Sequence, residues 1–358
     1  MDKKNVLNAL RLKELVLPLG AIFLGLLVGG IVILWIGKNP FTAYASLFYG
    51  AFGDLNRFAN TIARATPLIL TGLAVAFAFR CGLFNIGVEG QLLIGALSAA
   101  FVGTTLSGLP AIIHLPLTIL SAMVASAIWA AIPGILKAKR GVHEVINTIM
   151  MNFIAYAFVA FIITGPLKAP GQIPKSADIL GSAQLIRLSE IAQWSTSRLN
   201  TGIFIALLAC VAIYYLLWKT TLGYEIRAVG LNPYAAEYGG ISVNRNIILA
   251  MVISGVLAGL AGAERVLGFH GSFILGFSPG YGFEGIAVAL LGKNHPAGVI
   301  LAAILFGSLS SGGRWMAFNT GVPTDIVTIL QAVIIFFVAA EQIVAWFFRN
   351  KKKTGQVA

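Results

Sequence analysis

The chain has 358 residues, of which 58% are hydrophobic and only 11% are charged, and its mean hydropathy is +0.87. A soluble domain usually carries about 25% charged residues, so this composition excludes an ordinary soluble fold and predicts a membrane protein. The formal net charge of +12 could suggest nucleic acid. In a membrane protein, however, excess Lys and Arg more often mark cytoplasmic loops, and we expect no nucleic-acid partner.

Apolar runs of about 18 to 23 residues recur along the chain, which is the length of a helix that crosses a bilayer core of roughly 30 Å. They predict an all-α polytopic fold of about ten transmembrane helices in one membrane domain over residues 15–348. A short segment, 1–14, and a basic tail, 349–358, are expected in the cytoplasm. The expected spans are 15–37, 65–79, 91–113, 115–136, 145–167, 201–218, 246–263, a short or broken element at 281–292, 296–313 and one within 325–349.

Two glycine-rich stretches, residues 81–91 and 269–285, interrupt the apolar pattern and predict broken helices. Ionisable residues inside a membrane usually face the bundle interior or a wet cavity, and transporters often place helix breaks at the solute site. Each polar residue, taken alone, could equally cap a broken helix or hold the bundle together. The candidate path residues are Asn85, Glu89, Asn147, Asn152 and Glu284, with Glu264 and Arg265 as further polar residues at membrane depth.

Residues 220–245 form a polar island between two apolar runs and contain a compact helix signal. Asn232 is a good N-cap, and Pro233 suits the first helical position, where its missing N–H costs nothing. Gly239 and Gly240 should end this helix after residue 238. Its small residues, Ala235 and Ala236, suggest a face that docks closely against another surface. The alternative is a loop that folds back on its own chain.

The distribution of basic residues predicts the orientation in the membrane. Lys137, Lys139 and Arg140 form a cluster typical of the cytoplasmic side, whereas the Ser- and Pro-rich stretch 166–200 is expected outside. With ten spans, more of the 25 Lys and Arg residues fall on the side that carries both termini. Both termini and the stretch 220–245 are therefore expected in the cytoplasm.

Apparent motifs for catalysis and for cofactor binding lack the surrounding sequence that such motifs require. Residues 280–285 match GxGxxG by letter, but no predicted strand precedes them. Gly292 and Lys293 resemble the end of a P-loop, but Ala287 stands where the first glycine is required, and Asn294 replaces Ser or Thr. The four histidines have no metal-ligand spacing, and Cys81 and Cys210 suggest no disulfide. We expect neither an enzyme nor a chain that carries its own metal or cofactor.

Four sequence blocks appear together and in order: FNIGVEGQ at 84–91, GVHEVINTIMMN at 141–152, EIRAVGLNPYAAEYGGI at 225–241 and GFEGIAVALLG at 282–292. Over roughly residues 61–340 the chain resembles the membrane permease of a bacterial ATP-binding-cassette importer. It is similar to the ribose and branched-chain amino-acid permease superfamily, and most similar to nucleoside (purine) uptake permeases.

The resemblance implies that the chain lies in the bacterial cell membrane and works with three partners. These are a cytoplasmic ATPase subunit, which would bind ATP and Mg, a second homologous permease that would form a heterodimer with this chain, and an extracellular substrate-binding lipoprotein. It also implies that the loop 223–241 contains the helix that couples to the ATPase. The residues implied for coupling are Gly223, Arg227, Asn232, Pro233, Ala235, Ala236, Glu237 and Gly240.

Two other functions remain open at this point. One is a secondary transporter of a small polar solute, for which Glu89 and Glu284 are the obvious candidates for an ion site. The other is a membrane scaffold without transport. An importer of this type could also carry a sugar or an amino acid instead of a nucleoside.

Overall fold

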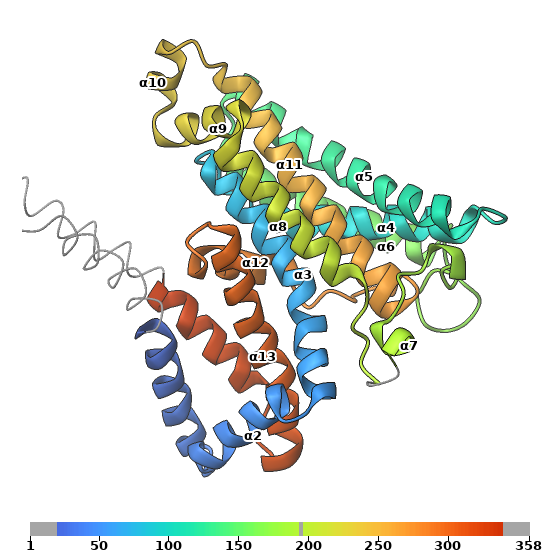
Figure 1. The fold of residues 1–358 in the computed structure, drawn as a ribbon, viewed down its shortest axis with the longest axis vertical. Helices are drawn as coiled ribbons and strands as arrows, with labels where there is room; N and C mark the ends of the chain where they lie inside the picture. The colour runs from blue at the N-terminus through green and yellow to red at the C-terminus, as the bar shows by residue number, and fades with distance from the viewer. Residues whose placement is uncertain (1–19, 193–195, 339–358) are drawn as a thin grey trace, which may run out of the picture. The chain divides into compact units, whose positions relative to one another are not determined.

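The structure is a computed structural model that describes residues 20–192 and 196–338 (Figure 1). These residues form α-helices, one 3-10 helix and one π-helix, and no strand. The labelled helices are α2 (Pro40–Phe52), α3 (Leu55–Arg80), α4 (Val88–Thr105), α5 (Ala111–Arg140), α6 (Glu144–Thr164), η1 (Gly181–Ala183), α7 (Leu188–Ala192), α8 (Gly202–Lys219), α9 (Thr221–Leu231), α10 (Pro233–Tyr238), α11 (Val243–Glu264), η2 (Arg265–His270), α12 (Tyr281–Leu291) and α13 (Pro296–Thr320).

Seven of the described helices are long and apolar enough to cross a membrane, so the all-α polytopic class is confirmed. They are α3, α4, α5, α6, α8, α11 continued by η2, and α13. Three shorter apolar helices are Gly20–Trp35, Tyr281–Leu291 and Asp325–Val338. The predicted first and last spans reach into residues 15–19 and 339–349, which lie outside the described residues, as do the segments 1–14 and 349–358. The count of ten spans therefore stays a prediction.

The predicted boundary between the third and fourth spans was wrong. The turn falls at residues 106–110, and His114 lies inside α5. Gly108 takes a φ of +85°, which favours glycine, and Pro110 occupies the N-cap of α5. Leu106, Ile112 and Ile113 surround this turn, so hydropathy alone does not reveal it.

The chain divides into two compact units, each described here by itself. The described part of unit 1 contains residues 20–54 and 308–338. Its core brings together Ile33, Leu47, Met316 and Leu330, all buried. A Cβ atom at Gly312 would lie 2.2 Å from the carbonyl oxygen of Leu47, so α2 and α13 approach each other closely in this unit. A single membrane domain over 15–348 stays a prediction.

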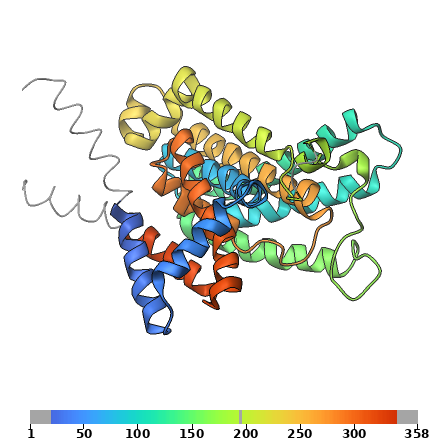
Figure 2. The same cartoon turned by 60° about the horizontal axis from the view of Figure 1, so that its bottom comes forward.

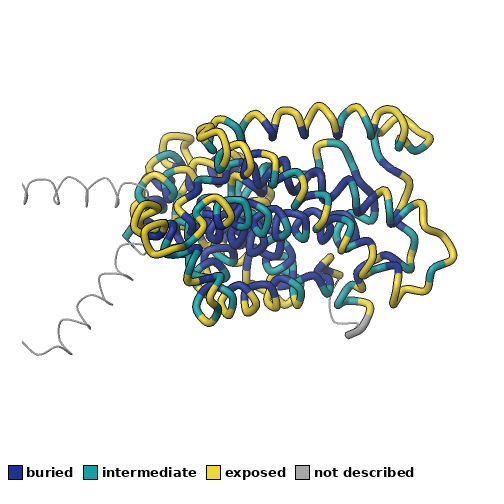
Figure 3. The backbone as a smooth tube through the Cα atoms, turned by 90° about the horizontal axis from the view of Figure 1, so that it is seen from above, coloured by how far each residue is buried: buried dark blue, intermediate teal, exposed yellow. Residues whose placement is uncertain are grey.

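Unit 2 contains residues 55–307 and is organised around α11, which packs against α3, α4 and α5. Small residues permit this packing, as is usual between membrane helices. A Cβ atom at Gly262 would lie 2.2 Å from the carbonyl oxygen of Leu92, and one at Gly259 would lie 2.5 Å from that of Ala122. Buried positions, dark blue in Figure 3, follow the inner sides of the helices.

The two ends of unit 2 differ in structure. Figure 1 shows α9 and α10 together at one end of these helices and α7 at the other. The last turns of α5 lie at the end that carries α9 and α10, because Gly134 packs against Ile248 and Met251 near the start of α11.

Two helices of unit 2 begin after stretches of non-helical backbone. Residues 83–87 precede α4, and residues 271–280 precede α12, which has only 11 residues. In Figures 1 and 2 the second stretch is the thin orange loop that returns from the end of η2 to α12. Asn85 is hydrogen-bonded to Ser254, which lies half-way along the 22 residues of α11. The first stretch is therefore placed deep between the helices.

Candidate functional site

The N-termini of α4 and α12 meet at this depth. The backbone N–H of Gly282, in the first turn of α12, donates to Glu89 Oε2 over 2.6 Å. A Cβ atom at Gly282 would lie 2.3 Å from the backbone nitrogen of Glu89, so the contact requires glycine. Helix N-termini carry partial positive charge and favour carboxylates. Glu89 and Glu284 each lie in the first turn of one of these helices.

The carboxyl group of Glu89 is fully buried, and its second oxygen, Oε1, has no hydrogen-bond partner among the described residues. The hydroxyl groups of Ser278 and Tyr156 lie close enough to interact with this carboxyl. Glu284 interacts with it electrostatically as well. A buried acceptor without a partner is costly and calls for an explanation. The bond to Gly282 therefore leaves one oxygen of this carboxyl without a hydrogen bond among the described residues.

Two asparagines satisfy the interrupted backbone before α4. Asn152, on α6, accepts from the N–H of Gly90 over 2.8 Å and donates to the carbonyl of Ile86 over 2.9 Å. Asn85 donates to Gln91 and to Ser254, and it accepts from the N–H of Gly87. These bonds link α4, α6 and α11. The geometry favours the structural role for both side chains.

The predicted path residues are only partly brought together. Asn85, Glu89, Asn152 and Glu284 surround the junction of α4 and α12, but Asn147 makes no hydrogen bond to this group. It lies on α6 about 7.5 Å before Asn152 along the helix axis, at 1.5 Å per residue. Its Nδ2 has no partner among the described residues. Lining of a path by any of the five remains a prediction.

The local structure predicted around Asn232 is confirmed. α10 covers Pro233–Tyr238, and the Asn232 side chain accepts from the N–H groups of Tyr234 and Ala235 over 3.0 and 3.1 Å. The chain leaves the helix through Gly240, whose φ is +82°.

The predicted small docking face is wrong in one respect. Ala236 is only 5% exposed, because α10 packs back on its own chain and the N–H of Ile241 bonds to the Ala236 carbonyl. The exposed side of this loop carries large apolar residues instead. Leu231, Tyr234 and Tyr238 are 88%, 84% and 98% exposed. Ala235 and Glu237 are also exposed. Clustered exposed apolar residues often mark an interaction site.

Glycines attach this loop tightly to the helices below it. A Cβ atom at Gly223 would lie 2.0 Å from the carbonyl oxygen of Leu216, at the corner between α8 and α9. A Cβ atom at Gly230 would lie 2.2 Å from the carbonyl oxygen of Arg80, at the end of α3. Arg227 donates to the Gly223 carbonyl over 3.3 Å. α9 therefore packs closely against α8 and against the end of α3.

A buried ion pair lies toward the other end of unit 2. Arg265 Nε and Nη2 donate to Glu264 Oε2 and Oε1 over 2.6 and 2.8 Å, and both side chains are buried. Nη2 also donates to the Ala63 carbonyl on α3, and Asn200, before α8, donates to Glu264. The guanidinium carbon lies 5.6 Å from the ring centre of Tyr281 on α12. The pair thus joins α11 and η2 to α3, to α12 and to the segment before α8. The sequence singles out Glu264 and Arg265 but gives no signal for Asn200.

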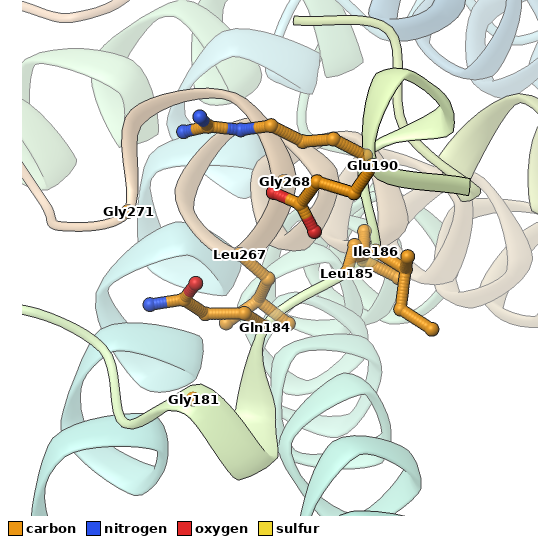
Figure 4. Close-up of a pocket in the computed structure, with 9 residues that line it drawn as sticks. Gly181, Gln184, Leu185, Ile186, Glu190, Leu267, Gly268 and Gly271 are labelled. Carbon is orange, nitrogen blue, oxygen red and sulfur yellow. The ribbon is translucent and has the colours of Figure 1, made fainter. Parts of the chain in front are cut away.

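A small cavity lies beside η2 at the same end. Its volume is about 110 Å³, and it lies between residues 181–190 and the backbone of Gly268 and Gly271 (Figure 4). Gln184, Arg187 and Glu190 contribute polar side chains. None of these residues was predicted from the sequence, because no local motif marks them.

The chain matches one protein-family model and is similar in sequence to several known transporter permeases. The sequence model of the family described as "Branched-chain amino acid transport system / permease component" matches residues 57–339. The guanosine ABC transporter permease protein NupP of Bacillus subtilis is 47% identical over 96% of this chain and 99% of its own length. The nucleoside ABC transporter permease protein NupB of Lactococcus lactis is 40% identical over 93% and 92%. The glucose ABC transporter permease protein TsgB13 of Haloferax volcanii is 37% identical over 91% and 87%.

The buried ion pair yields a stability prediction. Arg265→Met leaves the Glu264 carboxylate buried without its partner, which typically costs about 3–5 kcal/mol. We expect a lower melting temperature in detergent and less protein in the membrane. Glu264→Gln combined with Arg265→Met removes both charges and should be less harmful than the single change. Arg198→Met is the control, because Arg198 is exposed at the same end. Equal stability of Arg265→Met and Arg198→Met would contradict the role of the pair.

Proposed function

The chain belongs to the family of permease components of the branched-chain amino acid transport system, and from this premise we propose that it is the permease subunit of a nucleoside importer driven by an ATP-binding cassette. The observation that carries the nucleoside assignment is the 47% identity to a guanosine permease across nearly both whole chains. A second nucleoside permease, at 40%, supports it. Family members are transport subunits, so the chain is not an enzyme.

The identity of the solute needs support of its own, because a relative named for glucose is also 37% identical to this chain. The junction of α4 and α12 offers two carboxyl groups, Glu89 and Glu284, together with the hydroxyl groups of Tyr156 and Ser278. Nucleosides present N–H and O–H donors on the base and the ribose, which suit these acceptors. The aromatic rings of Tyr156 and Tyr281 suit a planar base.

The proposed coupling rests on how residues 223–241, here called the docking loop, are attached to the helices. A cytoplasmic ATPase subunit would contact the exposed residues Leu231, Tyr234 and Tyr238, and would itself bind ATP and Mg²⁺. Movement of α9 would be passed to α3 and α8 through Gly230 and Gly223. We further propose a second homologous permease beside this chain and an extracellular binding lipoprotein that delivers the solute.

We place the end with α9 and α10 in the cytoplasm of the bacterium, together with both termini. The basic residues at the end of α5, Lys137, Lys139 and Arg140, lie at this end. Residues 166–200 would then lie outside, with the cavity of Figure 4. The bacterial cell membrane is the proposed location.

The substrate is tested by competition for uptake. Cells without their own nucleoside importers would express the chain with its partner subunits and take up labelled guanosine. Unlabelled adenosine should compete, whereas glucose and leucine should not. Competition by glucose or leucine as strong as that by adenosine would contradict the nucleoside assignment. Loss of uptake after collapse of the ion gradients, with ATP maintained, would instead indicate a secondary transporter.

The path is tested with Glu89→Gln. Glutamine keeps a side-chain oxygen for the N–H of Gly282, so membrane abundance should stay close to that of the wild type. Hydrogen bonds to charged groups are worth about 1.5–3 kcal/mol, so guanosine uptake at low concentration should fall roughly tenfold or more. Glu190→Gln, at an exposed position, is the control. Unchanged guanosine uptake would show that Glu89 does not line the path. Loss of the protein from the membrane would indicate that Glu89 has only a structural role.

The docking loop is tested by Tyr234→Ala combined with Tyr238→Ala. Aromatic residues often dominate interfaces, and truncation of such a residue costs about 2 kcal/mol or more. Retention of the ATPase in a pull-down should fall more than tenfold, with the chain still in the membrane. Tyr215→Ala, at an exposed tyrosine of α8, is the matched control. Asn232→Ala should act more mildly, since loss of an N-cap costs about 1 kcal/mol. Full ATPase retention in the double variant would rule out this docking face.

Orientation is tested with single cysteines at Lys139 and Gln172, both exposed. The native Cys81 and Cys210 are buried and would be replaced by alanine. A membrane-impermeant maleimide should label Gln172→Cys in intact cells and Lys139→Cys only after permeabilisation. The reverse pattern would invert the proposed topology.

A further inference from the structure

A groove of about 310 Å³ runs along the outside of unit 2, away from the junction of α4 and α12. It lies between α8 and the start of α13. Its lining is almost wholly apolar, and it includes Leu207, Val211, Tyr214, His295, Ala297 and Ile300. The three α8 residues are spaced as one helix face, so the groove extends about 10 Å along α8, at 1.5 Å per residue.

Cations lie at the end of the groove nearest to α9. Lys219 ends α8, and Lys293 lies in the turn between α12 and α13, and both are exposed. Arg80 stacks over the ring of Trp218, with its guanidinium carbon 5.2 Å from the ring centre. Among the described residues no carboxylate forms an ion pair with Lys219, Lys293 or Arg80. The local charge is therefore positive and unbalanced.

The turn that carries Lys293 is held in an unusual conformation. Lys293 and Asn294 have φ angles of +53° and +52°, in the left-handed region that side chains other than glycine seldom adopt. Arg80 donates to the carbonyl groups of both residues, over 3.3 Å to Lys293 and 2.9 Å to Asn294. Such strain persists where the surroundings enforce it and is common at functional sites.

His295 closes the same end of the groove. Its Nδ1 accepts from the N–H of Ala297 over 3.2 Å, so the neutral ring carries its proton on Nε2. Burial, and then the charge of Arg80, hold the pKa of His295 below its usual value. The ring packs against Tyr214 and Trp218, with centroids at 5.8 and 5.1 Å. Tyr and Trp are typical of the level at which lipid headgroups lie.

We propose that this groove binds an anionic phospholipid of the inner leaflet, with one acyl chain along α8 and the phosphate at Lys219 and Lys293. The inference rests on the proposed orientation, which places this end at the cytoplasm. The groove length fits within half of a hydrocarbon core of roughly 30 Å. Basic pockets between membrane helices on the cytoplasmic side are known to suit anionic headgroups. A zwitterionic lipid such as phosphatidylcholine has no net charge and would leave these cations unbalanced.

The position of the groove connects lipid binding to the docking loop. Arg80, which holds the Lys293 turn, is also the residue whose carbonyl Gly230 of α9 approaches. The Gly223 corner follows directly after Lys219. A lipid at the groove thus steadies the base of α9, and ATP-driven transport by the assembled importer should depend on anionic lipid.

The test measures lipid retained by the purified importer. The complex is equilibrated in detergent with equal phosphatidylglycerol and phosphatidylcholine, and bound lipid is counted by native mass spectrometry. Phosphatidylglycerol should be retained in preference. Lys219→Gln combined with Lys293→Gln should lower its affinity about 25-fold, at roughly fivefold for each charge near the membrane surface. Ala297→Trp, which fills the groove, should abolish retention.

The control is Lys139→Gln combined with Arg140→Gln, which removes the same charge from exposed residues at the end of α5. It should change retention less than twofold. Equal retention of both lipids, an equal loss in the control, or unchanged retention in Ala297→Trp would overturn the proposal. Loss of the second permease in Ala297→Trp without loss of lipid would assign the groove to a protein contact instead. Lipid counts are independent of cargo, so failure here leaves the nucleoside assignment standing.

Discussion

Backbone groups buried among membrane helices must find hydrogen-bond partners inside the protein, because lipid supplies none. This constraint is most severe where α4 and α12 begin, since residues 83–87 and 271–280 are not helical. The Glu89 carboxylate, accepting from Gly282, joins the two helix N-termini directly. Asn152, from α6, satisfies a donor and an acceptor of the same interrupted stretch. The interruption is stable only because side chains remote in sequence meet there.

The same arrangement leaves a hydrogen-bond acceptor without a partner at the centre of unit 2, among the residues described. Glu89 uses one oxygen for Gly282 and retains the other without a partner among the residues described. The ordinary way to stabilise a buried carboxylate is to saturate it with donors. A pathway for a polar solute has the opposite requirement, because a saturated site has nothing to offer. In the proposed function, Glu89 would combine its structural bond to Gly282 with an acceptor for the solute.

In the proposed transport mechanism, events at the docking loop must reach this junction. Glycines provide that connection by allowing contacts that no side chain would permit, between α9 and the ends of α8 and α3. α3 in turn packs on α12, where a Cβ atom at Gly285 would lie 2.8 Å from the Thr71 hydroxyl. Close glycine contacts thus join α9 to the end of α3, and α3 to the helix that carries Glu284. The groove proposed to bind a phospholipid lies beside the first of these contacts.

Local and compositional signals were enough for much of this protein. Hydropathy set the helical membrane class, and Asn232, Pro233 and Gly240 set α10, because capping and chain reversal depend on neighbouring residues alone. The four sequence blocks identified the family.

Tertiary structure decided the rest. The turn at 106–110 is hidden from hydropathy by its apolar neighbours. Ala236 is buried and Tyr238 is exposed because of the way α10 folds back on its own chain. The contacts of Glu89 with Gly282 and of Glu264 with Asn200 join residues far apart in the chain. Sequence by itself determined which residues are polar at membrane depth, and only packing of the helices determined which of them have partners.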